Sequence, residues 1–154
     1  MAMAERAWCL VVPHHARGAR VARHRLAAEL SDAVPPALLA DAISVVAELV
    51  GNAILHAAPL PGGVVRVAWR LRAHPSDGDP DPVVEVRVTD GGAPQVPRSR
   101  PCDPEALDGR GLGIVAALAT RWGVDRDGLG QSVWAELSAA AAIRPASPSL
   151  AGAW

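Results

Sequence analysis

The sequence predicts an α+β two-layer sandwich, with a mixed, mostly antiparallel sheet and helices packed on one face. Two observations support this fold class. Helix-like and strand-like segments do not alternate strictly along the 154 residues, and several strand-like segments are joined as hairpins. A doubly wound sheet needs regular alternation, so that class is disfavoured. The length fits one domain, at residues 1–137, followed by an Ala-, Pro- and Ser-rich tail at 138–154 that we expect to be disordered.

The first half of the chain is expected to form one strand and two helices. Residues 7–12 are a short apolar run ended by Pro13, which predicts a strand. Residues 16–30 form an amphipathic pattern with arginines on the outer face, and this face is either simply solvated or docks onto an acidic partner protein. Residues 36–57 predict one buried helix that starts with proline in its first turn. Its buried face is expected to comprise Leu39, Ile43, Val46, Val50 and Ala53.

The second half is expected to supply the rest of the sheet and a short helix. The predicted elements are strands at 64–71 and 83–90, an apolar helix at 111–120, and a closing hairpin of strands at 122–127 and 131–137. Residues 91–109 are rich in Gly, Pro, Arg and Asp and show no periodicity. So long an irregular loop in a compact domain is usually functional or disordered.

A polar stripe runs along the predicted central helix. Its members recur at spacings of three and four, and they are Asp41, Ser44, Glu48, Asn52 and His56. Burying such groups unpaired costs about 1–3 kcal/mol each, so the stripe faces either solvent or a polar ligand. Asn52 offers a neutral oxygen that suits Mg²⁺, and Glu48, one turn away, is a candidate general base. A structural hydrogen bond is the expected role of His56.

Two further motifs follow in the second half of the chain. Asp90 ends a predicted strand and is followed by two glycines. Its carboxylate can accept a hydrogen bond from an exocyclic amino group such as that of adenine, or it can simply form an Asp-Gly turn. The second motif opens the predicted short helix and consists of Gly109, Arg110, Gly111, Leu112 and Gly113. Its glycines either let backbone N–H groups approach an anion or serve as a flexible hinge.

The composition excludes or disfavours several function classes. All 15 basic residues are arginine, so a P-loop and Schiff-base chemistry are excluded because each needs a lysine. A net charge of −1 and the lack of clustered aromatic residues disfavour a nucleic-acid-binding regulator. Cys9 and Cys102 are isolated thiols, which fits a reducing cytoplasm better than a disulfide framework. No apolar run is expected to be long enough to span a membrane, and the N-terminus does not resemble a signal peptide.

Taken together and in this order, the motifs resemble those of the histidine-kinase-like (GHKL) ATPase superfamily, whose nucleotide-binding fold is the Bergerat fold. Within it, the chain most resembles the anti-sigma-factor serine-protein kinases and their small bacterial relatives. The resemblance extends from about residue 8 to 137. It implies that the protein binds ATP with Mg²⁺, and that Asn52 holds the metal while Glu48 is the catalytic base. His56 belongs to the same motif.

The resemblance also implies roles for the later motifs. Asp90 and Gly92 are expected to contact adenine, and the Gly109–Gly113 motif is expected to end the loop that covers the phosphates. Ser132 occupies a place where relatives often have a threonine near the adenine-binding aspartate.

At the level of function, the resemblance implies an anti-sigma factor with serine/threonine protein kinase activity. Its expected partners are a sigma factor, a STAS-type anti-anti-sigma protein, or both, and some relatives are homodimers. An alternative remains open, in which the protein is a catalytically weak regulator that uses the same pocket and binds its partner under the control of the nucleotide. Neither interpretation requires nucleic acid or a membrane.

Overall fold

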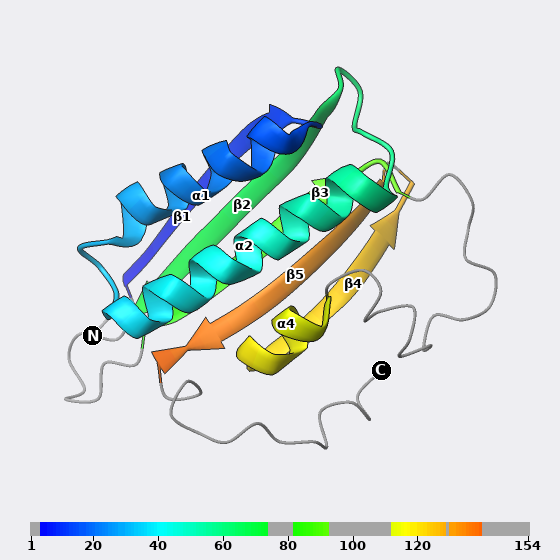
Figure 1. The fold of residues 1–154 in the computed structure, drawn as a ribbon. Coiled ribbons are helices and arrows are strands. Elements are labelled where there is room, and N and C mark those ends of the chain that lie inside the picture. Colours follow the sequence, from blue (N-terminus) through cyan, green and yellow to red (C-terminus); the bar gives the residue numbers. More distant parts are fainter. Residues whose placement is uncertain (1–3, 74–81, 93–111, 129, 140–154) are drawn as a thin grey trace.

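The computed structural model describes residues 4–73, 82–92, 112–128 and 130–139. Every helix and strand expected from the sequence is present there (Figure 1). The elements are β1 (Ala4–Pro13), α1 (Ala16–Leu30), α2 (Pro36–His56), β2 (Val64–Ala73), β3 (Val83–Asp90), α4 (Leu112–Leu118), β4 (Arg121–Asp127) and β5 (Gly130–Ser138). Strand β5 therefore ends one residue inside the segment assigned to the tail, and residues 140–154 of that segment lie outside the described residues.

The five strands form one sheet in the order β1-β2-β3-β5-β4, and each neighbouring pair is antiparallel. The expected sheet was mixed. The difference arises because β5 lies between β3 and β4. These two strands, which helix α4 connects, run in the same direction, but each pairs with β5 and not with the other. The α+β two-layer prediction is confirmed, with an antiparallel sheet among the described strands.

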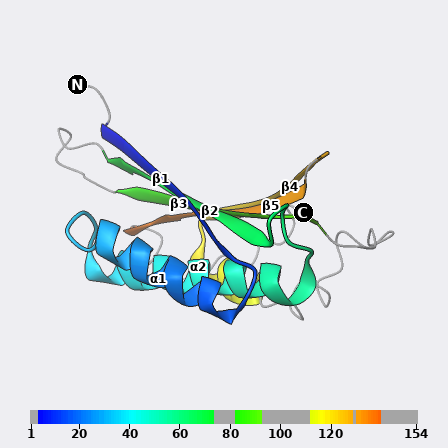
Figure 2. The same cartoon turned by 90° about the horizontal axis from the view of Figure 1, so that it is seen from above.

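All three described helices lie on one face of the sheet (Figure 2). The strands bury the side chains that point toward this helical layer. In β3, buried and half-buried residues alternate without a break, as expected for a strand with one covered face. The largest fully buried side chain is Trp69, which stacks with Trp8 at a ring-centroid distance of 6.3 Å. The core thus lies between the sheet and the helices.

Helix α2 lies across the middle of the helical layer (Figure 1). Its buried residues are Leu38, Ala42, Val45, Val46, Leu49, Val50 and Ala53. The expected buried face differs from this one by a rotation about the helix axis. Of its residues, Leu39 and Ile43 are only partly buried against the core. Because α2 is apolar on every side except its polar stripe, spacing alone could not distinguish two adjacent apolar faces. At 21 residues α2 is also long and apolar enough for a membrane span, which the sequence analysis did not anticipate, yet one face of it is buried against the sheet.

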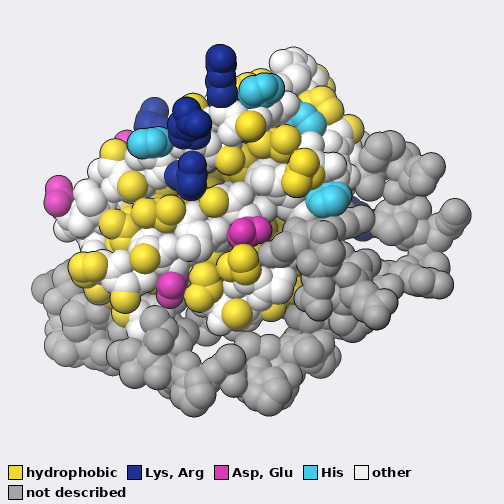
Figure 3. All heavy atoms as spheres, in the orientation of Figure 1, with side chains coloured by type: hydrophobic (Ala, Val, Ile, Leu, Met, Phe, Trp, Pro, Cys, Tyr) yellow, Lys and Arg dark blue, Asp and Glu magenta, His cyan; other side chains and the backbone are white. Residues whose placement is uncertain are grey.

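The basic side chains of α1 are exposed. Its buried residues are small or apolar, and Arg17, Arg20 and Arg23 point away from them. Figure 3 shows basic side chains gathered over this helix. Among the described residues these three arginines form no ion pair, whereas Arg25 lies 3.7 Å from Glu29. The structure therefore leaves the arginine face accessible.

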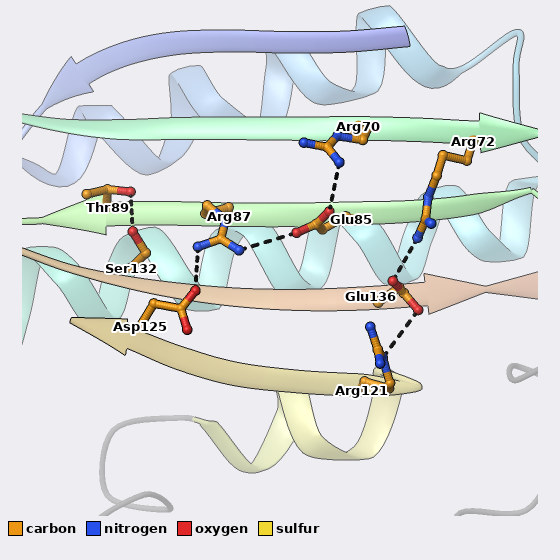
Figure 4. A network of polar contacts seen from close by, with 9 residues as sticks. All are labelled: Arg70, Arg72, Glu85, Arg87, Thr89, Arg121, Asp125, Ser132 and Glu136. Carbon is orange, nitrogen blue, oxygen red and sulfur yellow. Dashed lines mark hydrogen bonds and ion pairs between the residues drawn. The ribbon is translucent and has the colours of Figure 1, made fainter. Parts of the chain in front are cut away.

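The sheet face opposite the helices, here called the outer face, carries a row of ion pairs (Figure 4). These are Arg70–Glu85 (3.9 Å), Arg87–Glu85 (3.5 Å), Arg87–Asp125 (2.9 Å), Arg72–Glu136 (2.7 Å) and Arg121–Glu136 (3.5 Å). Each such pair near the surface contributes only about 0–1 kcal/mol. The row shows that the outer face is polar and suited to water, as is common for one side of an antiparallel sheet.

Two leucines of α2 test the buried face of this helix. Leu38 is 0% exposed and Leu55 is 77% exposed. Leu38→Ala should lower the free energy of unfolding by about 2–5 kcal/mol, because it leaves a cavity in the core. Leu55→Ala is the matched control and should change it by less than about 0.5 kcal/mol. Urea unfolding followed by circular dichroism measures both, and equal losses would contradict the face described for α2.

Candidate functional site

A narrow cleft lies between the C-terminal half of α2 and the adjoining ends of β3 and β5. Its lining residues are Leu49, Asn52, Ala53, His56, Ala57, Val88, Asp90, Gln131 and Val133. The floor consists of two cross-strand pairs, Val88 with Val133 and Asp90 with Gln131. The cleft therefore brings together Asn52, His56 and Asp90, three of the residues predicted from the sequence. A wider hollow on the outer face holds none of the predicted site residues.

The side-chain oxygen of Asn52 is buried and has no hydrogen-bond partner among the described residues. An unsatisfied buried oxygen costs about 1–3 kcal/mol, so this atom needs a partner that the described residues do not supply, such as water, a metal ion or another ligand. A neutral amide oxygen fits Mg²⁺, the metal expected here. In the described part of the chain, no group of three or more His, Cys, Asp or Glu residues could hold a metal. An ion on Asn52 would therefore take its other ligands from water and phosphate.

Glu48 lies one helical turn before Asn52 and is half-buried. Its carboxylate forms no hydrogen bond or ion pair with any described residue, so it is available to a ligand next to Asn52. Within the polar stripe, Asn52 and His56 line the cleft, whereas Asp41, Ser44 and Glu48 are not among its lining residues. Ser44 is exposed, and burial raises the pKa of the Asp41 carboxyl above its ordinary value.

The C-terminal end of α2 is held by a histidine that the sequence analysis did not select. Nε2 of His14 lies 3.1 Å from the carbonyl oxygen of Ala53 and 2.9 Å from that of Ala57. The Ala53 carbonyl also accepts a hydrogen bond of 3.2 Å from the backbone N–H of Ala57. The Ala57 carbonyl lies at the end of the helix, where carbonyls have no partner within the helix, and the contact with His14 satisfies it. His56, for which a structural hydrogen bond was expected, is exposed and makes none with the described residues. The structural role at this end of α2 belongs to His14.

Asp90 is 3% exposed and is the one buried charged side chain in the described part of the chain. Its Oδ1 accepts a hydrogen bond of 2.7 Å from the backbone N–H of Gly92. Gly92 has a φ of 87°, a conformation that side-chain-bearing residues rarely adopt. The Asp-Gly turn considered for this motif is therefore present. The same turn holds the Asp90 carboxylate in the cleft, so the two interpretations are compatible.

The placement of Ser132 corrects an expectation. In the β3–β5 register Ser132 is opposite Thr89, and their hydroxyl oxygens lie 2.7 Å apart on the outer face (Figure 4). The residue opposite Asp90 is Gln131. Since successive side chains of a strand point to opposite faces, Gln131 and not Ser132 shares the cleft with Asp90. Sequence reasoning missed Gln131, although the apolar alternation that starts at Val133 could have identified it.

The glycine-rich motif falls only partly within the described structure. Gly109, Arg110 and Gly111 lie outside the described residues. Leu112 begins α4 and is 3% exposed, so its side chain belongs to the core. Gly113 is exposed on the same helix.

Comparison with known proteins agrees with the motifs. A family model described as "Histidine kinase-like ATPase domain" matches residues 12–137 of the chain. The matched segment includes the whole of α2, the whole of β3 and all of β5 but its last residue. A search of curated proteins found no match.

Proposed function

Since the chain belongs to the histidine kinase-like ATPase domain family, we propose that this ATP-binding regulatory protein is an anti-sigma factor with serine/threonine kinase activity. Its proposed substrate is a STAS-type anti-anti-sigma protein. The observation that carries the proposal is the cleft, where the unpaired buried oxygen of Asn52 and the buried carboxylate of Asp90 lie in one lining.

The residues of the cleft and the neighbouring Glu48 have distinct roles in this proposal. Asp90 accepts a hydrogen bond from the adenine amino group, and Asn52 holds Mg²⁺, which would neutralise charge on the phosphates. Glu48 accepts the proton of the substrate hydroxyl while the hydroxyl oxygen attacks the γ-phosphorus of ATP. The new P–O bond forms as the bond to the β–γ bridging oxygen breaks, and ADP leaves. Such a transfer depends mainly on positioning and electrostatics, so no covalent enzyme intermediate is needed.

A second candidate function keeps the same cleft without catalysis. In it, ATP acts as a conformational ligand, and the partner protein docks onto the arginines of α1. The exposed and unpaired state of Arg17, Arg20 and Arg23 favours this docking surface. A surface of this kind attracts acidic segments and raises the rate of association. The kinase and the nucleotide-gated regulator can share this surface, so only phosphoryl transfer distinguishes them.

Binding of ATP is tested by calorimetry on the wild type and on Asn52→Leu, with Mg²⁺ and with EDTA. Wild-type protein should bind ATP, and chelation or the substitution should each weaken binding by about tenfold or more. Leucine has a similar volume and removes an unsatisfied oxygen, so the variant should be at least as stable as the wild type. No binding of millimolar ATP by the wild type would refute the proposed function.

Kinase activity is tested with labelled ATP and a panel of STAS-type proteins as acceptors. Glu48→Gln should reduce phosphoryl transfer by about 10²–10⁴-fold, because it removes the base, while ATP affinity stays within about twofold. If no acceptor is labelled although ATP binds, the nucleotide-gated regulator is the better description. Full transfer by Glu48→Gln would show that another group accepts the proton.

Partner docking on α1 is tested by charge reversal. Arg20→Glu should weaken binding of the STAS-type or sigma-factor partner by about tenfold or more, and added salt should weaken wild-type binding. Arg66→Glu is the matched control, because Arg66 is exposed on the outer face and forms no ion pair within the described part of the chain. Equal effects of the two variants would show that net charge, and not α1, governs binding.

A further inference from the structure

A row of three polar side chains crosses one end of the sheet on its helical face. In register, Asp90 of β3 is opposite Gln131 of β5, and Gln131 is opposite Arg126 of β4. Asp90 and Gln131 line the cleft, while Arg126 lies exposed beyond it. Side chains directly opposite each other on neighbouring strands have Cβ atoms about 4.5–5.5 Å apart. Asp90 and Gln131 are therefore close enough to contact neighbouring atoms of a single ligand.

The orientation of the Gln131 amide follows from its partner. Nε of Arg126 donates a hydrogen bond of 3.0 Å to Oε1 of Gln131. A guanidinium can only donate, so the amide oxygen, and not the nitrogen, must face Arg126. The amide nitrogen of Gln131 forms no hydrogen bond with any described residue. Arg126 thus leaves Gln131 as a hydrogen-bond donor toward the cleft.

An acceptor and a donor side by side suit one edge of a 6-aminopurine. Adenine presents an amino donor at position 6 next to an acceptor at N1. A 6-oxopurine such as hypoxanthine reverses both groups, with an acceptor at position 6 and a donor at N1. The carboxylate of Asp90 has several acceptor sites, of which the N–H of Gly92 occupies one on Oδ1. The Asp90–Gln131 pair therefore complements adenine and opposes the oxopurine at two neighbouring positions.

We propose that Gln131 is a base-reading residue of the cleft and that Arg126 is its positioning residue. This inference rests on the proposed binding of ATP and deepens it, because it assigns the choice of base to a donor–acceptor pair. Next to the row, Val133 and Val124 form a register pair on the same face, and Val124 is 41% exposed. This apolar surface suits the flat face of a purine. Arg126 acts only by preventing the amide from turning over.

The test compares binding of Mg²⁺·ATP and Mg²⁺·ITP, which differ only at position 6 and N1, to the full-length protein by calorimetry. Wild type should bind ATP at least about tenfold more tightly than ITP. Gln131→Leu keeps the approximate volume and should reduce this ratio by about 3- to 10-fold. Arg126→Leu frees the amide to rotate, so the ratio should fall through tighter binding of ITP, which general structural damage would not produce. Thr89→Ala, next to Asp90 but with its side chain on the outer face, should leave the ratio unchanged.

Each other outcome has a distinct meaning. If wild type binds neither nucleotide, the proposed function fails and the inference fails with it. If it binds both equally, or if Gln131→Leu keeps the wild-type ratio, base reading by Gln131 is refuted while ATP binding stands. If Arg126→Leu weakens the binding of ATP and of ITP by the same factor, the positioning role of Arg126 is refuted.

Discussion

The packing of α2 on the sheet is the constraint on which the rest of the structure depends. The helix buries seven residues on one face, and this burial sets its rotation about its own axis. The rotation in turn places Asn52 at the edge of the core, where its oxygen is buried without a partner. A helix with a weaker apolar face could turn to expose that oxygen to water, at little cost. Here the apolar contacts hold the amide where its oxygen needs a partner from outside the described residues, either water or a ligand.

The helix that borders the cleft and the strand beneath it are each held by a different kind of contact. On the helix side, His14 contacts two carbonyl oxygens at the end of α2. On the sheet side, Gly130 lies so close to the backbone of Asp90 that any added Cβ would collide with its carbonyl oxygen. The turn at Asp90 therefore packs directly on β5. These contacts hold the end of α2 and the turn at Asp90 in place, and so position the side chains that line the cleft.

Much of this could be predicted from sequence because local patterns determine it. Alternation identified the strands, and motif order identified the family, including Asn52 and Asp90 as cleft residues. Other features depend on three-dimensional choices that local patterns leave open. The face of α2 was ambiguous because the helix is apolar nearly all round, and the error at Ser132 was a shift of one residue, which in a strand exchanges the two faces. His14 could not be found, because its partner carbonyls are 39 and 43 residues away and carry no side-chain signal.

The insertion of β5 between β3 and β4 also affects how the domain folds. The β4–β5 hairpin is local and can form early, but the β3–β5 pairing joins segments far apart, since Thr89 and Ser132 are separated by 43 positions in the sequence. Closing so long a stretch of chain is entropically costly and slow. The floor of the cleft consists entirely of that long-range pairing, so it exists only once folding is nearly complete. A nascent chain that still lacks its last strand has only the β3 half of the floor, and ligand binding therefore stabilises the finished domain above all.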